Sequence, residues 1–131
     1  MRVTGLDHVN IRTPDVEETC RFFVNVLGMK VLPSPVSDNL KDAAWVADAT
    51  GHAVVHLISS HFRPSPDGDP PTGGGRVDHF ALSCKGYDDA IARLRELGAP
   101  CRADGRVRNG VRQIFTADPN GVAIELNFSG D

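Results

Sequence analysis

Three histidines and one glutamate occupy corresponding positions in the two halves of this 131-residue chain. His8 and His79 each follow an aspartate near the start of their half, and His56 and Glu125 lie near the end of theirs. Imidazole nitrogens and carboxylate oxygens are ligands for divalent ions such as Zn²⁺, Fe²⁺, Ni²⁺, Mn²⁺ and Co²⁺. The four side chains therefore predict a site for one divalent metal ion, with His56 as its fourth ligand or as a catalytic base.

The correspondence comes from a weak internal repeat of about 70 residues. Four blocks recur in the same order, 5–11 with 76–82, Gly28 with Gly98, 47–51 with 117–121, and 55–57 with 124–126. We interpret residues 1–131 as one domain built from two modules, 1–60 and 76–131. The linker at 61–75 is rich in proline and glycine, which disfavour regular structure there.

Each module is expected to fold as a strand, a helix and then three further strands. Apolar residues at helical spacing predict helices over 15–27 and 88–97, each followed by a glycine. Asp15 with Glu18 three residues later resembles a capping box at the start of the first helix. Strands are expected at 6–11, 29–33, 42–47, 53–59, 77–82, 99–103, 111–117 and 122–128, with tight turns at 109–110 and 118–121. Two βαβββ modules of this kind predict an α+β fold in which the modules form a cupped half-barrel around a shared cavity.

The candidate ligand at the end of the first module has a register problem. The glycine of the preceding turn stands five residues before His56 but only four before Glu125. A slip of one residue turns every side chain of a strand to the opposite face. We therefore expect a small bulge in this strand or a difference between the two turns. Without such an adjustment, Val55 would face the cavity, and His52, which shares the strand parity of His56, would be the substitute to test.

Other polar residues are candidates for binding a substrate. Arg106, Arg108 and Arg112 fall within an arginine-rich segment, 102–112. Guanidinium groups suit carboxylates and phosphates, although the same segment also fits a solvated hairpin. Asn10, on the histidine-bearing face of the first strand, could orient a substrate oxygen or make a structural hydrogen bond.

Composition and charge exclude several classes of protein. Hydrophobic residues make up 40% of the chain, charged residues 24%, and the formal charge is −3, which argues against a disordered or strongly nucleic-acid-binding chain. No apolar run approaches the length of a membrane span, and nothing resembles an export signal, so we expect a cytoplasmic protein. Cys20, Cys84 and Cys101 are odd in number and lack CxxC spacing, which disfavours a disulfide framework.

The sequence resembles the vicinal oxygen chelate superfamily over essentially the whole chain. That superfamily includes glyoxalase I, fosfomycin and bleomycin resistance proteins, methylmalonyl-CoA epimerase and extradiol dioxygenases. The resemblance rests on Leu6-Asp7-His8-Val9, Leu27-Gly28-Met29, Val77-Asp78-His79-Phe80-Ala81-Leu82 and Asp118-Pro119-Asn120-Gly121-Val122-Ala123-Ile124-Glu125-Leu126. It implies paired βαβββ modules, a bound divalent metal ion, a small-molecule substrate and a homodimer. Its ligand positions match His8, His79 and Glu125.

The resemblance also implies an activity. We expect a glyoxalase-like lyase or isomerase that acts through a metal-bound enolate on a molecule with two adjacent oxygens, with His56 and Glu125 as catalytic residues. His56 departs from the glyoxalase I pattern, which generally has a glutamate there. One alternative is an extradiol-type ring-cleaving dioxygenase with non-haem iron and His56 as its acid-base group. Another is a metal-free resistance protein that binds a drug.

Overall fold

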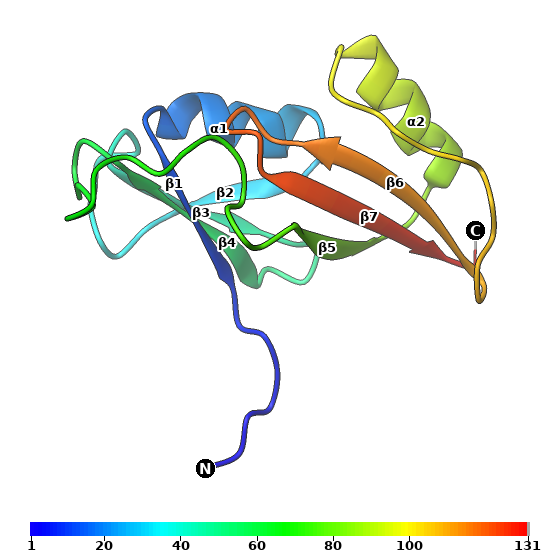
Figure 1. The fold of residues 1–131 in the computed structure, drawn as a ribbon, viewed down its shortest axis with the longest axis horizontal. Coiled ribbons are helices and arrows are strands. Elements are labelled where there is room, and N and C mark those ends of the chain that lie inside the picture. Colours follow the sequence, from blue (N-terminus) through cyan, green and yellow to red (C-terminus); the bar gives the residue numbers. More distant parts are fainter. Residues whose placement is uncertain (131) are drawn as a thin grey trace. The chain divides into compact units, whose positions relative to one another are not determined.

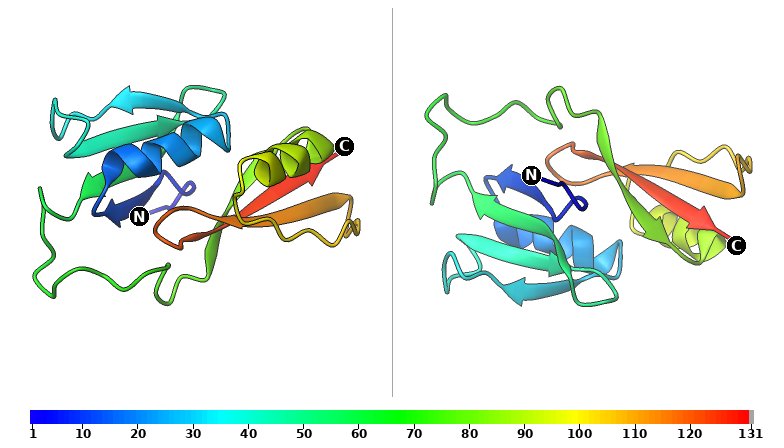
Figure 2. Two further views of the ribbon diagram at one scale, coloured as in Figure 1. Left: turned by 90° about the horizontal axis from the view of Figure 1, so that it is seen from above. Right: turned by 90° about the horizontal axis from the view of Figure 1, so that it is seen from below.

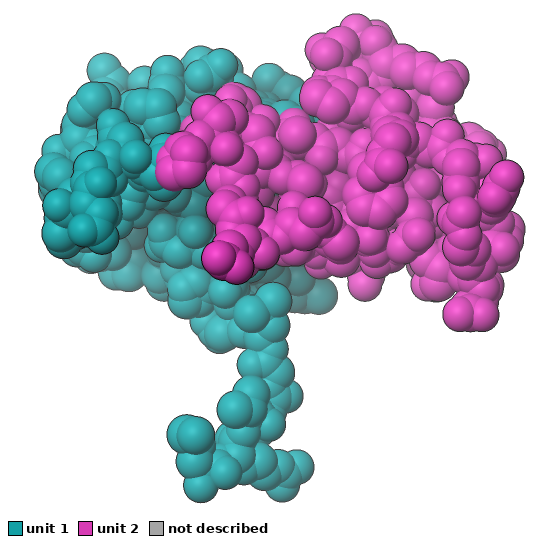
Figure 3. Space-filling model, viewed as in Figure 1, with its two compact units in different colours: residues 1–70 teal, residues 71–131 magenta. Residues whose placement is uncertain are grey.

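The computed structural model describes residues 1–130, which form helices and two β-sheets (Figure 1). In chain order the elements are β1 (Val9–Thr13), α1 (Val16–Asn25), β2 (Lys30–Pro33), β3 (Ala43–Ala47), β4 (Ala53–Ser59), β5 (His79–Cys84), α2 (Tyr87–Glu96), β6 (Val111–Ala117) and β7 (Ala123–Ser129). The chain divides into two compact units, Met1–Pro70 and Pro71–Asp131 (Figure 3). Mixed α+β structure with two sheets confirms the predicted fold class.

Unit 1 contains a four-stranded sheet in the order β1-β4-β3-β2. β1 runs parallel to β4, and the other neighbours are antiparallel. α1 covers one face of this sheet (Figure 2), where its residues Val16, Phe22 and Phe23 are buried. Val46 and Val55 of the central strands are completely buried too. The opposite face, which we call the open face of unit 1, therefore carries the more polar side chains.

Unit 2 repeats this arrangement with a three-stranded sheet in the order β5-β7-β6. β5 is parallel to β7, and β6 is antiparallel to it. α2 lies on one face of the sheet (Figure 2), and the Tyr87 ring meets the Phe128 ring edge-on with centroids 5.4 Å apart. Ile124 and Leu126 are buried on the same face. The residues that alternate with them, among them Glu125, lie on the open face of unit 2.

Local capping and turn chemistry follow the expectations from sequence. The side chain of Asp15 accepts the backbone N–H of Glu18 at 2.8 Å, which caps the start of α1. Gly28 adopts a φ of +67° after the helix. Asn109 and Gly110 have φ values of +51° and +75°, as a two-residue hairpin turn requires.

One predicted strand, at 99–103, is wrong. Only Arg102 pairs, as an isolated bridge with Phe115 whose two hydrogen bonds are both 2.9 Å long. The chain then turns away, because the Asp104 side chain accepts the backbone N–H of Arg106 at 2.9 Å and Gly105 has a φ of +68°. The sheet of unit 2 therefore ends at β6.

Each helix spans ten residues. Within residues 1–130, no helix combines the length and apolar character needed to cross a membrane.

Candidate functional site

The two Asp-His pairs have the same geometry in both units. Nδ1–H of His8 donates to Asp7 Oδ2, and Nδ1–H of His79 donates to Asp78 Oδ2, each at 2.6 Å. Because an ionised carboxylate can only accept, a neutral ring in either pair carries its proton on Nδ1 and presents an unprotonated Nε2. The hydrogen bond from His8 also holds the pKa of the Asp7 carboxyl below its ordinary value. Metal-binding histidines in proteins are oriented by partners of this kind.

A β-bulge places His56 on the open face of unit 1. The ladder between β3 and β4 skips Val54, whose neighbours Ala53 and Val55 pair with consecutive residues of β3. Val55 is therefore completely buried under α1, while His56 points to the other side. This is the extra residue expected from the spacing in the sequence.

His56 lies between two other rings in a continuous stack. Its ring centroid is 3.7 Å from that of His8 and 4.4 Å from that of Trp45, with interplanar angles of 17° and 10°. Asn10 stands beside His56 in the register of β1 and β4 and is exposed. An imidazole binds a metal ion through a lone pair that lies in the plane of its ring. Two stacked, nearly parallel rings therefore do not direct their lone pairs at a common point.

Burial lowers the pKa of His56, and the neighbouring His8 lowers it further. A lowered pKa leaves the imidazole neutral at pH 7, when it can accept a proton or bind a metal ion. His52 also lowers the pKa of His56, whereas the Asp7 carboxylate raises it.

The free energy of unfolding of the metal-free protein is expected to rise with pH between the lowered pKa of His56 and the ordinary value of about 6.5. In that window the unfolded chain binds a proton that folded His56 does not, so acid favours unfolding. His56→Gln should flatten this rise, measured by urea unfolding from about pH 5 to 7, whereas His61→Gln at an exposed position should not. An unchanged slope in His56→Gln would contradict the prediction.

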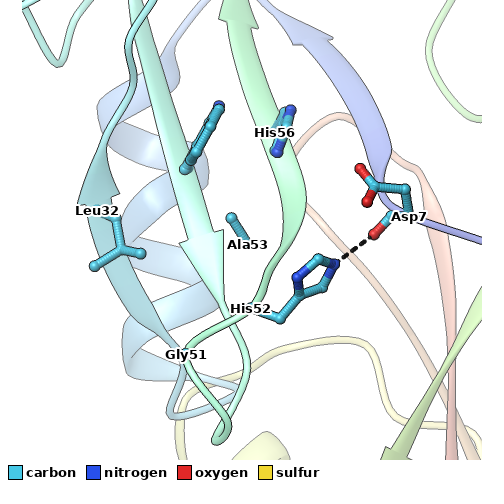
Figure 4. A pocket seen from close by; sticks show the side chains of 7 residues that line it. Asp7, Leu32, Gly51, His52, Ala53 and His56 are labelled. Atoms are coloured by element: carbon cyan, nitrogen blue, oxygen red, sulfur yellow. Dashed lines mark hydrogen bonds between the residues drawn. The ribbon is translucent and has the colours of Figure 1, made fainter.

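A pocket of about 350 Å³ opens beside His56 within unit 1 (Figure 4), lined by Asp7, Leu32, Trp45, Gly51, His52, Ala53 and His56. Leu32, Trp45 and Ala53 give it an apolar wall. His52 Nε2–H donates to the Asp7 carbonyl oxygen at 2.9 Å, so His52 ties the chain ahead of β1 to the β3–β4 turn. The volume is within the range of small-molecule sites in proteins.

Glu125 is the centre of a polar network on the open face of unit 2. Its side chain is 12% exposed, and its Oε2 lies 3.2 Å from Nε2 of His79. Its Oε1 accepts hydrogen bonds from Gln113 Nε2 and Asn127 Nδ2, each at 2.8 Å. When His79 is neutral, its proton is on Nδ1 toward Asp78, so the electron pairs on Nε2 and Oε2 face each other. A proton or a metal cation between these two atoms removes their repulsion.

The four predicted metal ligands therefore occur as two pairs, His8 with His56 in unit 1 and His79 with Glu125 in unit 2. Among residues 1–130, no group of three or more His, Cys, Asp or Glu side chains could hold a metal ion. His8 supplies one nitrogen donor in unit 1, and His79 with Glu125 supplies a nitrogen and an oxygen donor in unit 2. The binding of all three to one ion stays a prediction.

The candidate arginines of unit 2 do not form one cluster, since two lie in a loop and the third lies on β6. Arg108 forms an ion pair with Asp104 at 2.7 Å in the loop before β6, and Arg106 is exposed in the same loop. Arg112 lies on the α2 side of β6, where its guanidinium group is 4.0 Å from the centroid of the Tyr87 ring. It therefore points away from the open face, where the predicted substrate contact would lie.

Reasoning from sequence missed three polar residues of the open faces, Gln113, Asn127 and Arg12. Asn127 stands between two buried residues and Gln113 precedes one, so strand parity was a signal that could have found them. Arg12 stands two residues after Asn10 on β1, and its guanidinium donates to the carbonyl oxygen of Arg63.

Comparison with known proteins identifies the family. The model of the Glyoxalase/Bleomycin resistance protein/Dioxygenase superfamily matches residues 5–126. Lactoylglutathione lyase of Salmonella typhimurium is 33% identical over 124 residues, which cover 91% of this chain and 88% of that protein.

Solved structures with the same fold include an antibiotic binding protein and a fosfomycin resistance protein. TnmS3, an antibiotic binding protein from Streptomyces, has a TM-score of 0.69 and 22% identity, with 99% of both chains covered. FosX, a fosfomycin resistance protein from Listeria monocytogenes, has a TM-score of 0.69 and 18% identity over 98% of this chain and 95% of its own. These two show likeness of fold alone. Because the family match spans nearly the whole sequence, the chain belongs to the glyoxalase/bleomycin resistance protein/dioxygenase superfamily.

Proposed function

We propose that this protein is a metal-dependent lyase or isomerase of the glyoxalase type, acting on a small molecule with two adjacent oxygens. The observation that carries the proposal is the matching Asp-His geometry of the two units, in which the aspartate occupies Nδ1 and leaves Nε2 of His8 and of His79 as the nitrogen that can bind an ion. Relatives named lactoylglutathione lyase, at about 30% identity, support an enzyme.

In this proposal one divalent ion, Zn²⁺, Fe²⁺, Ni²⁺, Mn²⁺ or Co²⁺, is held by Nε2 of His8, Nε2 of His79 and Oε2 of Glu125. The two units that supply these ligands belong either to one chain or to two chains of a homodimer. When bound, the ion would withdraw electrons from the two substrate oxygens and make a neighbouring C–H bond more acidic.

His56 is proposed as the general base rather than the fourth ligand. Its ring is stacked on that of His8, so the two rings do not present their lone pairs to the same ion. Neutral His56 would accept the proton from the carbon beside the substrate carbonyl group and return it to the adjacent position. Asn10 lies next to His56 and is proposed to orient a substrate oxygen, while the pocket beside Trp45 takes the apolar part of the substrate.

Elemental analysis combined with a substrate screen tests this function. Protein purified without added metal, or titrated with each of the five ions, is expected to hold about one ion per chain. The loaded protein is then tested with glutathione hemithioacetals, acyl-CoA thioesters and catechols. Absence of metal uptake would overturn the proposal and favour a metal-free binding protein.

A ring-cleaving dioxygenase is the second candidate, because two histidines and one carboxylate with a free histidine nearby also suit non-haem iron. Oxygen consumption that depends on both Fe²⁺ and a catechol would select it over the lyase or isomerase.

The aspartates of the two Asp-His pairs provide a matched prediction. Asp7→Asn and Asp78→Asn are each expected to weaken metal binding about tenfold, the lower end of the usual 10–100-fold effect of such partners. The smaller effect is expected because these carboxylates are exposed, at 77% and 93%. Affinity is measured by competition with a coloured chelator, and Asp89→Asn on the exposed side of α2 is the control. Unchanged metal affinity in both variants would show that the two aspartates do not strengthen metal binding by His8 and His79.

A further inference from the structure

The Glu125 carboxylate is held at one oxygen by two side-chain amides. Gln113 Nε2 and Asn127 Nδ2 both donate to Oε1, each at 2.8 Å. Gln113 Nε2 also donates to Asn127 Oδ1 at 3.1 Å. The three side chains therefore form a closed ring of hydrogen bonds on the open face of unit 2.

The ring fixes the orientation of both amides. Asn127 Oδ1 accepts from Gln113, so the NH₂ group of Asn127 must face Glu125. Both N–H bonds of the Gln113 amide are used, one toward Glu125 and one toward Asn127. Oε1 thus has two donors, and Oε2 alone is left facing Nε2 of His79 at 3.2 Å.

The corresponding place in unit 1 shows that the sheet itself does not need these amides. Trp45 pairs with His56 as Phe115 pairs with Glu125. Two residues along each strand, Ala43 pairs with Ile58 where Gln113 pairs with Asn127. Both apolar residues of unit 1 are buried, at 1% and 6% exposure. The same strand pairing thus forms in unit 1 without the amides, and the amides occur only in the unit that has the carboxylate.

We propose that Gln113 and Asn127 are positioning residues that make Glu125 a one-oxygen ligand, a role that rests on the proposed function of Glu125 in metal binding. The two amides occupy Oε1 and prevent the carboxylate from rotating to offer both oxygens to the ion. The carboxylate then binds the ion through Oε2 in an orientation that is already fixed before binding. The Glu125 side chain therefore loses less conformational freedom than an unrestrained carboxylate would.

The test measures metal binding directly, with Co²⁺ as the probe. Gln113→Met and Asn127→Leu remove the donors but keep much of the side-chain volume. Ser83→Ala is the matched control, because Ser83 pairs with Asn127 across β5 and β7 and is exposed on the same face. The dissociation constant is obtained by chelator competition, and thermal unfolding of the metal-free proteins reports any purely structural effect.

Each donor variant is expected to bind Co²⁺ about 10–100-fold more weakly than the wild type, with Ser83→Ala unchanged. The infrared difference spectrum between loaded and metal-free wild type, which needs no variant to fold, should show a carboxylate bound through one oxygen. Variant affinities within a factor of about two of the wild type, or a two-oxygen infrared signature, would overturn the positioning role alone. Absence of saturable Co²⁺ binding by the wild type would overturn the proposed function as well.

Discussion

Replacing Glu125 with glutamine is expected to weaken divalent metal binding by more than about a hundredfold and to abolish turnover. Glu125 supplies the carboxylate of the proposed ligand set, and a neutral amide is a poorer ligand that leaves more positive charge on the ion. Removing a direct ligand should cost more than the 10–100-fold loss that follows removal of an outer hydrogen-bond partner.

Chelator competition with Zn²⁺ or Ni²⁺ measures this loss, and Glu96→Gln is the control. Glu96 is an exposed carboxylate in the same unit, at the end of α2, so its variant carries the same change in net charge. Equal metal affinity in Glu125→Gln and wild type would remove Glu125 from the ligand set.

His56→Gln is expected to lower kcat by about 10²–10⁴-fold, the usual contribution of a positioned general base, while metal affinity stays within a few-fold. Glutamine cannot accept a proton at neutral pH, but the ion would still have its three ligands. The expectation follows from the stacked rings, whose interplanar angle of 17° keeps the lone pairs of His8 and His56 from converging.

The two readouts of this variant separate the possible roles of His56. Activity is measured with the substrate found in the screen, metal affinity by chelator competition, and His61→Gln serves as the control. A large loss of affinity would make His56 a ligand that turns when the ion binds. If neither quantity changes, His56 has no part in the mechanism, and His52 would be tested next.

The repeated spacing in the sequence predicted where most elements lie, because strand and helix periodicities depend on local residue patterns. It also predicted that a bulge or a turn difference must absorb one extra residue before His56, since a count of residues is enough to detect the excess, and the structure has the bulge. The Asp15 cap and the Asn109–Gly110 turn were predictable for the same reason, as each depends on neighbours in the chain.

Features that depend on three-dimensional neighbours were not predictable. The stack of Trp45, His56 and His8 joins three separate segments, and no local pattern encodes the angle between their rings. Arg112 was grouped with the nearby arginines along the chain, although alternation along β6 directs it toward α2 and Gln113 to the open face. Strand parity is therefore a better guide to a shared face than proximity in sequence.

A crystal structure of the Zn²⁺-loaded protein, with an anomalous difference map at the zinc edge, tests the central claim most directly. We expect one peak per site at about 2.0–2.2 Å from Nε2 of His8, Nε2 of His79 and Oε2 of Glu125, contributed by one chain or by two. A peak bound to other side chains, or these three atoms far apart in every pairing of chains, would contradict that claim.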